Sequence, residues 1–241
     1  MSKVILITGS NTGIGLGLAR LLAEKKHTVY IASRKETAGK EALATLHSEG
    51  LTNVKLVLLD VTKEPTIDAA RTTIEAAEGH LDVLVNNAAV GMIGTDQRAP
   101  SASIDALRSA METNVYGVIR TTTIFLPLLR RSPNPVILNV SSALASGTRQ
   151  ARPGAGNHHV AYNSSKAALN SYTIALAAEL AAEGVRVNLV TPGLVSTQMN
   201  GYIAGGASAR VGAQSLLPWA LIDKDGPTGK FFGPDGSELP W

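Results

Sequence analysis

The chain has 241 residues, 44% of them hydrophobic and 17% charged, a composition that can fill a sizeable core and that excludes a disordered chain. The formal net charge of +3 is spread along the chain without a basic block, so we expect no nucleic-acid partner. There is no cysteine, which excludes disulfides, thiolate catalysis and cysteine-based zinc sites and is compatible with a reducing compartment.

The beginning and the hydropathy of the chain predict a cytoplasmic protein with no membrane partner. Met1, Ser2 and Lys3 are followed at once by an apolar run at 4–7, which is not the pattern of a secretory leader. No apolar stretch approaches the roughly 18 residues that span a bilayer. The last residues, 238–241, match no retention or peroxisomal signal.

Short apolar segments rich in β-branched residues alternate with longer amphipathic segments. The apolar segments predict buried strands at 4–7, 28–32, 54–59, 83–85, 136–140 and 185–190. The amphipathic segments predict helices at 14–26, 36–49, 64–78, 104–131 and 161–183, the fourth in two pieces. One more strand, flanked by turns, is expected within 226–236.

Strands that are apolar on both faces and separated by helices predict an α/β fold of the Rossmann type: a doubly wound, mainly parallel, seven-stranded sheet with helices on both faces. We expect a single domain over 1–241, with a cofactor half at about 1–135 and a catalytic and substrate half at about 136–241. Ligands of such sheets bind beyond the carboxyl ends of the strands. Functional residues are therefore expected directly after the strands.

A glycine-rich turn follows the first strand and opens the first helix. Glycines there allow a tight turn and a close approach to a pyrophosphate, and the helix N-terminus supplies N–H donors. The spacing is not G-x-G-x-x-G, because Leu18 stands at the last glycine position, and a plain flexible turn is the alternative interpretation. The residues predicted to bind the cofactor are Gly9, Ser10, Asn11, Thr12, Gly13, Ile14 and Gly15.

The end of the second strand predicts a preference for NADP. Ser33 and Arg34 stand where NAD-binding folds carry an acidic residue, and no carboxylate comes before Glu36. A guanidinium suits a 2′-phosphate, although Arg34 could also be an ordinary surface charge. After the third strand, Asp60 and Val61 are predicted to flank the adenine, with an N-cap role as the alternative for Asp60.

A serine pair and a Tyr-x-x-x-Lys motif predict acid/base chemistry. Ser141 and Ser142 end the fifth strand, and Tyr162 and Lys166 share one face if their segment is helical. A nearby ammonium favours the phenolate and lowers the pKa of a tyrosine toward the working range. By itself, the Tyr-x-x-x-Lys motif is more typical of a solvated helix pair. Together with the glycine-rich turn and the serine pair it favours catalysis, and we expect Tyr162 to protonate a carbonyl oxygen that Ser142 holds.

These motifs identify a resemblance to the classical short-chain dehydrogenases/reductases that covers essentially the whole chain. The segment 8–15 looks like the family's T-G-x3-G-x-G motif, 86–89 is similar to its N-N-A-G, and 192–197 is similar to its P-G-x3-T. Residues 226–236 resemble the corresponding segment of carbonyl-reductase-like members. The family's asparagine, serine, tyrosine and lysine fall on Asn114, Ser142, Tyr162 and Lys166.

The resemblance implies roles for these residues. Asn114 would anchor a water that links Lys166 to solvent as a proton relay, Lys166 would also bond the nicotinamide ribose, and Thr197 would bond the carboxamide. The further implied cofactor contacts are Asn87, Ala88, Tyr162, Pro192, Gly193 and Val195.

Two departures from the family pattern stand out. Ala89 replaces a glycine, which an alanine tolerates where φ is negative. The gap between Ser142 and Tyr162 is longer than usual, and the inserted residues, 147–156, are expected at the entrance of the site. The insertion bears on assembly, because family members pair into dimers or tetramers through the helices that carry the asparagine and the tyrosine, whereas members with such insertions can be monomers. Both a homo-oligomer and a monomer stay open.

The sequence thus predicts an NADPH-dependent oxidoreductase of the carbonyl reductase type, with NADH less favoured. The substrate would be a small to medium, fairly apolar ketone or aldehyde, with the reverse alcohol oxidation also possible. Two alternatives stay open: the same site acting on a quinone or an imine in secondary metabolism, and a non-catalytic sensor of NADP(H).

Other features have bland interpretations as well as functional ones. His158 and His159 are adjacent and lack a third ligand at a suitable spacing, so we expect no metal site. Trp219 and Trp241 could line a substrate pocket or pack in the core. The Gly/Ala/Ser-rich segment at 201–213 lies where the family places a mobile substrate lid.

Overall fold

The computed structural model describes residues 2–155 and 159–241. Within these residues one parallel sheet of seven strands has the order β3-β2-β1-β4-β5-β6-β7. The predicted doubly wound sheet is confirmed, and the order reverses between β1 and β4, which creates the switch point where such folds bind ligands. The strands are β1 Val4–Ile7, β2 Thr28–Ser33, β3 Val54–Leu58, β4 Val83–Asn86, β5 Val136–Val140, β6 Arg186–Val190 and β7 Phe231–Phe232.

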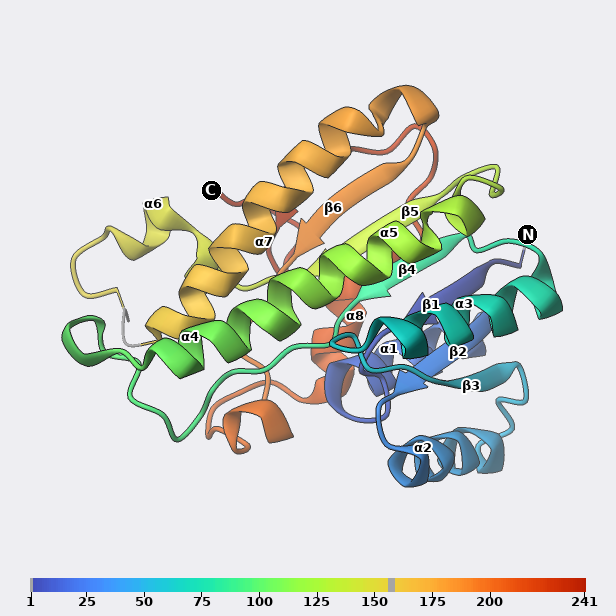
Figure 1. Ribbon diagram of the computed structural model, residues 1–241, viewed down its shortest axis with the longest axis horizontal. Helices are drawn as coiled ribbons and strands as arrows, with labels where there is room; N and C mark the ends of the chain where they lie inside the picture. Colours follow the sequence, from blue (N-terminus) through green and yellow to red (C-terminus); the bar gives the residue numbers. More distant parts are fainter. Residues whose placement is uncertain (1, 156–158) are drawn as a thin grey trace.

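Helices cover both faces of this sheet, with α5 and α7 in front of it in the view of Figure 1. Side chains of α1 and α8 pack with β1 and β2 in one apolar cluster, and side chains of α3, α5 and α7 pack in a second cluster on the other face. All residues of β1, β4 and β5 are buried, as expected for strands covered on both sides. The helices are α1 Gly13–Glu24, α2 Glu36–Ser48, α3 Glu64–Glu78, α4 Ile104–Met111, α5 Gly117–Leu129, α6 Gly147–Gln150, α7 Val160–Glu179 and α8 Ala209–Ala220.

The segment predicted to be helical at 104–131 is interrupted at a predicted site residue. It is divided into α4, a π-helical turn at Glu112–Tyr116 and α5. Such a turn widens the helix by one residue and is common at functional sites. Asn114 lies in it, so the irregular turn falls on a predicted site residue.

The segment at 201–213 differs from the sequence-based expectation. The predicted lid at 201–213 is irregular only as far as Ser208, whose side chain accepts a hydrogen bond from Val211 N and caps α8. The small residues at the start of α8, which the sequence predicts to be part of a lid, have a packing role. A Cβ at Gly17 of α1 would lie 3.1 Å from Ala209 O and 3.1 Å from Ala213 Cβ. The small residues allow α1 and α8 to pack closely.

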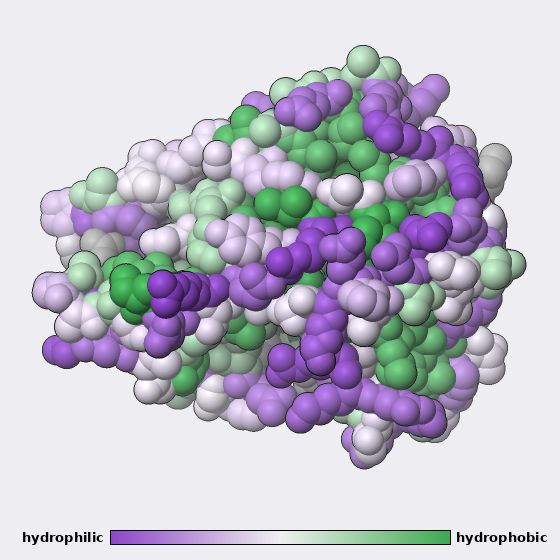
Figure 2. Space-filling model, in the orientation of Figure 1, coloured by the Kyte–Doolittle hydropathy of each residue, from purple (hydrophilic) through white to green (hydrophobic). Residues whose placement is uncertain are grey.

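Both tryptophans take part in aromatic packing with β7. Trp219 stacks on Phe232 with ring centroids 3.6 Å apart, and Trp241 lies 5.8 Å from the Phe231 ring. The core interpretation of Trp219 is therefore the one that the packing favours. Figure 2 shows apolar and charged residues interspersed over the face in view. Of the helices in the described ranges, none combines the length and the hydropathy that crossing a membrane requires.

Candidate active site

The glycine-rich turn after β1 is shaped by contacts that leave no room for side chains. Gly9 and Gly13 both have φ of +59°, a left-handed backbone that favours glycine. Gly15 has ordinary backbone angles, but a Cβ there would lie 2.6 Å from Asn87 Nδ2 and 2.9 Å from Ser10 Cα. The turn is thus held against the end of β4, at the switch point of the sheet.

The first turn of α1 opens toward the segment that follows β6. Thr12 is the N-cap residue, and its side chain makes no capping bond to any described residue. A Cβ on Gly13 would lie 3.6 Å from Thr197 Cγ2, so Thr197 stands directly beside this helix end. Unpaired N–H groups and the helix dipole suit an anionic group here, and the geometry fits a pyrophosphate.

Three of the predicted cofactor residues, Ser10, Asn87 and Ala88, form hydrogen bonds within the protein. The Ser10 hydroxyl is buried, donates to Ile7 O at 2.7 Å and accepts from Ala32 N at 2.9 Å, so it ties β1 to β2 and is turned away from the cradle. Asn87 Nδ2 donates to Thr8 O and Gly9 O at 2.9 and 3.0 Å, and Ala88 N donates to Thr8 Oγ1 at 3.0 Å.

Ile14 packs its side chain toward α8 and belongs to the rim of the core. Asn11 remains partly exposed at the turn. The side chains of Ser10, Asn87 and Ile14 therefore shape the glycine-rich turn, and its backbone is the part that could bind an anionic group.

At the end of β2, Arg34 is exposed next to the buried Ser33, whose hydroxyl donates to Lys35 O at 2.8 Å. The first acidic residue after the strand, Glu36, begins α2 and pairs with Lys40 at 2.7 Å. This strand end thus carries two exposed cations, Arg34 and Lys35, and the charge of Arg34 lowers the pKa of Asp60 at the neighbouring end of β3.

Asp60 and Val61 follow β3, as predicted, and both interact with the protein itself. Asp60 Oδ1 accepts from Thr62 N and Thr62 Oγ1 at 3.0 and 2.7 Å. Burial alone would raise the pKa of Asp60; the Thr62 hydrogen bonds and the charges of Lys63 and Arg34 outweigh it, so this pKa lies below its usual range. α3 has Lys63 as its N-cap, so the N-cap alternative for Asp60 is wrong.

The Val61 side chain is buried against Gly117, where a Cβ would lie 2.7 Å from Val61 Cγ2. Val61 thus packs against the start of α5, directly after the π-helical turn.

Ser142, Tyr162 and Lys166 lie together beyond the carboxyl end of β5. Ser142 follows the strand directly, and its side chain hydrogen-bonds to the Tyr162 hydroxyl. Lys166 lies one turn further along α7, with Nζ 5.9 Å from the centre of the Tyr162 ring and 2.7 Å from Val140 O. The neighbouring Ser141 turns the other way and donates to Asn170 Oδ1 at 2.7 Å.

Burial controls the protonation of this cluster. It raises the pKa of Tyr162 to about 12, and the hydrogen bond from Ser142 offsets only part of that rise. Burial also lowers the pKa of Lys166 to about 8. The expectation that the ammonium lowers the pKa of the phenol is not met in this structure, because the loss of hydration is the larger effect. At neutral pH the phenol therefore carries its proton.

The Asn114 side chain connects the loop after β4 to α7. Its Oδ1 accepts from Val90 N at 2.8 Å, and its Nδ2 donates to Val90 O at 3.0 Å and to Ser165 Oγ at 2.9 Å. Ser165 precedes Lys166, so Asn114 braces the helix at the level of the lysine.

The segment after β6 closes the other side of the site. Val195 pairs with Ala207 in an isolated parallel bridge, so the two ends of the 195–207 loop are held together. Gly193, with φ of +77°, lets the chain turn after Pro192. The exposed large apolar side chains around this loop, together with one from the loop after β4, are Ile93, Leu194, Met199, Tyr202 and Ile203.

Sequence reasoning missed one buried residue that contacts the helix carrying Tyr162. Gln97 is buried in the loop between β4 and α4, and its Oε1 accepts from the backbone N–H of Tyr162 at 3.2 Å. A lone glutamine in a loop belongs to no motif, so no local signal could have found it.

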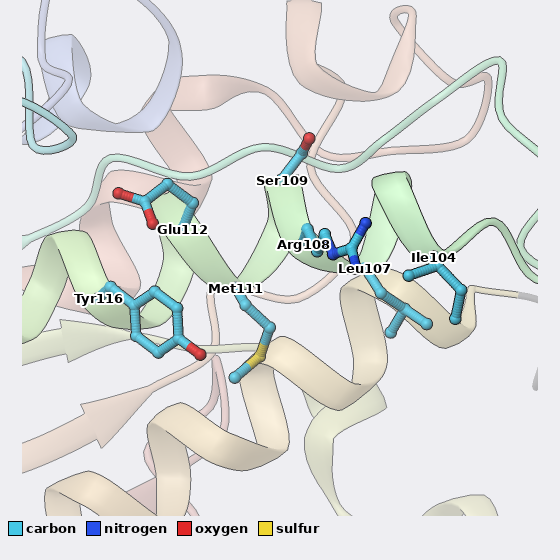
Figure 3. Close-up of a pocket in the computed structure, with 7 residues that line it drawn as sticks. All are labelled: Ile104, Leu107, Arg108, Ser109, Met111, Glu112 and Tyr116. Carbon is cyan, nitrogen blue, oxygen red and sulfur yellow. The ribbon is translucent and has the colours of Figure 1, made fainter.

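Two cavities flank the site. One of about 350 Å³ lies beside Ser142 and is lined by Ala143, Leu144, Arg149, Gln150 and residues 152–155 of the insertion. The larger, of about 570 Å³, lies on the outer flank of α4, where Leu107, Met111 and Tyr116 emerge in Figure 3. That flank belongs to the helix region carrying Asn114, through which pairing is expected in oligomeric members, and the oligomeric state stays open.

No cluster of metal-ligating side chains occurs among residues 2–155 and 159–241. His159 is exposed, and its neighbour His158 lies outside the described residues.

Comparisons with known proteins agree with this geometry. The family model described as short chain dehydrogenase matches residues 3–206. Salutaridine reductase of Papaver bracteatum is 31% identical, over 98% of this chain and 95% of its own length. The structure of ElxO with NADP bound has 25% identity and a TM-score of 0.84, and covers 97% of each chain. A 3-ketoacyl-(acyl-carrier-protein) reductase of Brucella melitensis complexed with NADH has 26% identity and a TM-score of 0.83, and covers 96% of each chain.

Proposed function

Because the chain belongs to the short-chain dehydrogenase family of oxidoreductases, we propose that it is an NADPH-dependent carbonyl reductase. The substrate would be a small to medium, fairly apolar ketone or aldehyde, and the reverse alcohol oxidation would use the same groups. The observation that carries this proposal is the hydrogen-bonded pair Ser142 and Tyr162, beside Lys166 and next to the glycine-rich turn.

The residues around the turn after β1 fit a dinucleotide. The glycine-rich turn and the first turn of α1 would hold the pyrophosphate, and Lys166 would bind the nicotinamide ribose. Thr197, whose Cγ2 lies 3.6 Å from a Cβ position at Gly13, would bind the nicotinamide end. When bound, the reduced nicotinamide supplies the hydride that a carbonyl carbon accepts.

Tyr162 would act as the general acid. Burial keeps the phenol protonated at neutral pH, so that Tyr162 has a proton for the carbonyl oxygen. A pKa of about 12 also makes it a weak acid, so the proton transfer depends on groups that stabilise the phenolate. Ser142 already hydrogen-bonds to the same hydroxyl and would hold that oxygen in place, as a preorganised donor. The ammonium of Lys166 would stabilise the phenolate left behind, and Asn114 would anchor the water that returns the proton.

The preference for NADPH rests on Arg34. Homologous folds hold either NADP or NADH, as the ElxO and Brucella structures illustrate, so the fold does not select the cofactor. The exposed guanidinium after β2, together with the engagement of Glu36 by Lys40, favours a 2′-phosphate over a free ribose hydroxyl.

The apolar character of the substrate rests on the entrance. Leu194 and Tyr202 are 58% and 67% exposed, and Met199 and Ile203 extend the same loop. Exposed apolar side chains gathered at a site entrance are typical of a surface that a ligand covers.

The proposal is tested by initial rates of cofactor oxidation across ketones, aldehydes, quinones and cyclic imines, with NADPH and NADH in parallel and the Tyr162→Phe protein as the blank. Turnover of a ketone or aldehyde with NADPH, lost in the variant, is the expected result. Turnover of quinones or imines alone would show that the substrate is not a ketone or aldehyde. No turnover of any test substrate, together with tight NADPH binding, would overturn the proposed enzymatic function in favour of a sensor of NADP(H).

A further inference from the structure

Gln97 lies in the loop between β4 and α4 and is only 4% exposed. A carboxamide carries two N–H donors and an acceptor oxygen, and burying it without partners is costly. The partners that it has are informative, because they belong to two different parts of the active site.

The amide oxygen of Gln97 serves the helix that carries the proton donor. Oε1 accepts from Tyr162 N at 3.2 Å, and the backbone oxygen of Gln97 accepts from Val160 N at 3.0 Å. The first N–H groups of a helix have no partner within the helix, and His159, the N-cap of α7, supplies no side-chain bond among the described residues. Gln97 therefore caps α7 from outside, at the turn that contains Tyr162.

The amide nitrogen of Gln97 serves the loop that faces the substrate. Nε2 donates to Gly91 O and to Met92 O, both at 3.0 Å. Met92 has φ of +56°, a left-handed conformation that is uncommon for a side chain of its kind and needs support from its surroundings. Two hydrogen bonds from one buried amide provide that support.

This loop brings apolar side chains to the entrance. A Cβ placed on Gly91 would lie 3.3 Å from Met199 O and 3.8 Å from Ile93 Cγ1, so the turn at 91–93 meets the loop after β6. Val90, just before the turn, is held by Asn114. Gln97 holds the turn at its other end and joins it to α7.

We propose that Gln97 is a positioning residue that sets the Tyr162 hydroxyl and the 91–93 turn at a fixed distance from each other. The proposal rests on the proposed function, since it assigns Tyr162 as the proton donor. Lys166 is bound separately to Val140 O, one turn deeper in α7. Loss of Gln97 should therefore disturb proton transfer and substrate fit while leaving NADPH binding intact.

The first test compares Gln97→Met, which keeps the length of the side chain but loses its hydrogen bonds, with Gln214→Met on the exposed surface of α8. We expect Gln97→Met to lower kcat by about 10- to 100-fold, because small displacements of a catalytic group have large effects. KM for the carbonyl should rise, the solvent isotope effect on kcat should increase, and the Kd for NADPH should stay within about twofold. A merely structural role would reduce the fraction of active protein and leave KM and the isotope effect unchanged.

Gln97→Glu adds a rescue test. The introduced carboxylate keeps an acceptor for Tyr162 N but presents no donor to the two carbonyls, whereas its protonated form regains one donor. The activity of this variant relative to the native protein should therefore rise as the pH falls from about 8 to about 5.5, because burial near carbonyl oxygens raises the pKa of a carboxyl group.

Amide hydrogen exchange separates this inference from the proposed function. Exchange of the first turn of α7 should be about tenfold faster in Gln97→Met than in the native protein or Gln214→Met, whether or not a substrate has been found. Unchanged exchange at Tyr162 N, or kcat and KM within about twofold of the native values in an active enzyme, would overturn the positioning role. A native protein that turns over no carbonyl would instead overturn the proposed function.

Discussion

The proposed cofactor cradle after β1 and the proposed catalytic cluster after β5, made of Ser142, Tyr162 and Lys166, occupy the same edge of the sheet but are built in different ways. The cradle is a continuous stretch of backbone whose shape depends on glycines at 9, 13 and 15. The catalytic cluster is an assembly of side chains from β5, α7 and two loops, held by buried hydrogen bonds. Adding a Cβ to one of the glycines should therefore disrupt the cradle, whereas removing a hydrogen-bonding group should disrupt the cluster.

The largest expected effect lies in the catalytic cluster. Tyr162→Phe removes the proposed proton donor and should lower kcat by about 10²- to 10⁴-fold, the usual contribution of general acid catalysis, while the Kd for NADPH, which Tyr162 is also expected to contact, changes far less than kcat. The comparison is Tyr172→Phe, which removes a hydrogen bond to Thr122 from the same helix. It should reduce the free energy of unfolding by about 1 kcal/mol and leave kcat unaltered. Equal losses of kcat in the two variants would mean that helix integrity, and not proton donation, had been measured.

In the cradle the corresponding change is Gly15→Ala. The added Cβ would meet Asn87 Nδ2 at 2.6 Å and Ser10 Cα at 2.9 Å, so the turn must shift. We expect a loss of about 1–3 kcal/mol in the free energy of unfolding, from thermal or urea denaturation, and a Kd for NADPH raised about 100-fold by calorimetry. Gly147→Ala is the control, because a Cβ there meets nothing within 4 Å among the described residues.

The two regions also differ in what the sequence reveals. The glycine motif, the strand ends and the Tyr-x-x-x-Lys pair are local patterns, and the predicted strands and most helices follow from apolar periodicity. Gln97 could not be found in this way, because its meaning depends on Tyr162, which is 65 residues away in the chain. The pKa of Tyr162 was expected in the wrong direction for the same reason: burial depends on the whole fold, whereas spacing reveals only the neighbouring lysine. Helix α8 was hidden because its small residues resemble a flexible loop.

Cofactor selection sharpens the comparison within the cradle half, since it depends on a side chain and not on backbone. Arg34→Ala should raise the Kd for NADPH by about 10- to 100-fold, the value of a hydrogen bond to a charged group, and leave the Kd for NADH within about twofold. Arg108→Ala, an exposed arginine beside Asp105, controls for net charge. An equal rise in the Kd values for NADPH and NADH in Arg34→Ala would show that Arg34 supports the loop and does not bind the 2′-phosphate.

The smallest expected effect is a pH dependence that only the catalytic cluster should produce. Burial lowers the pKa of Lys166 to about 8, from 10.5 for an ordinary lysine. Between about pH 8 and pH 10.5 Lys166 is protonated in the unfolded chain but has lost its proton in the folded chain, so the free energy of unfolding should rise with pH. Below about pH 8 Lys166 is protonated in the folded and in the unfolded chain, and the cost of burying the ammonium is constant. Burial also raises the pKa of Tyr162 to about 12, so that tyrosine lowers stability only above about pH 10.

In urea titrations without cofactor, the free energy of unfolding of the native protein should gain about 1–2 kcal/mol over that of Lys166→Met between pH 8 and pH 10. The same difference measured against Lys224→Met, an exposed lysine, should stay flat. A flat difference for both variants would mean that the ammonium of Lys166 is hydrated in the folded protein, and that its charge is available to Tyr162 over the whole working range.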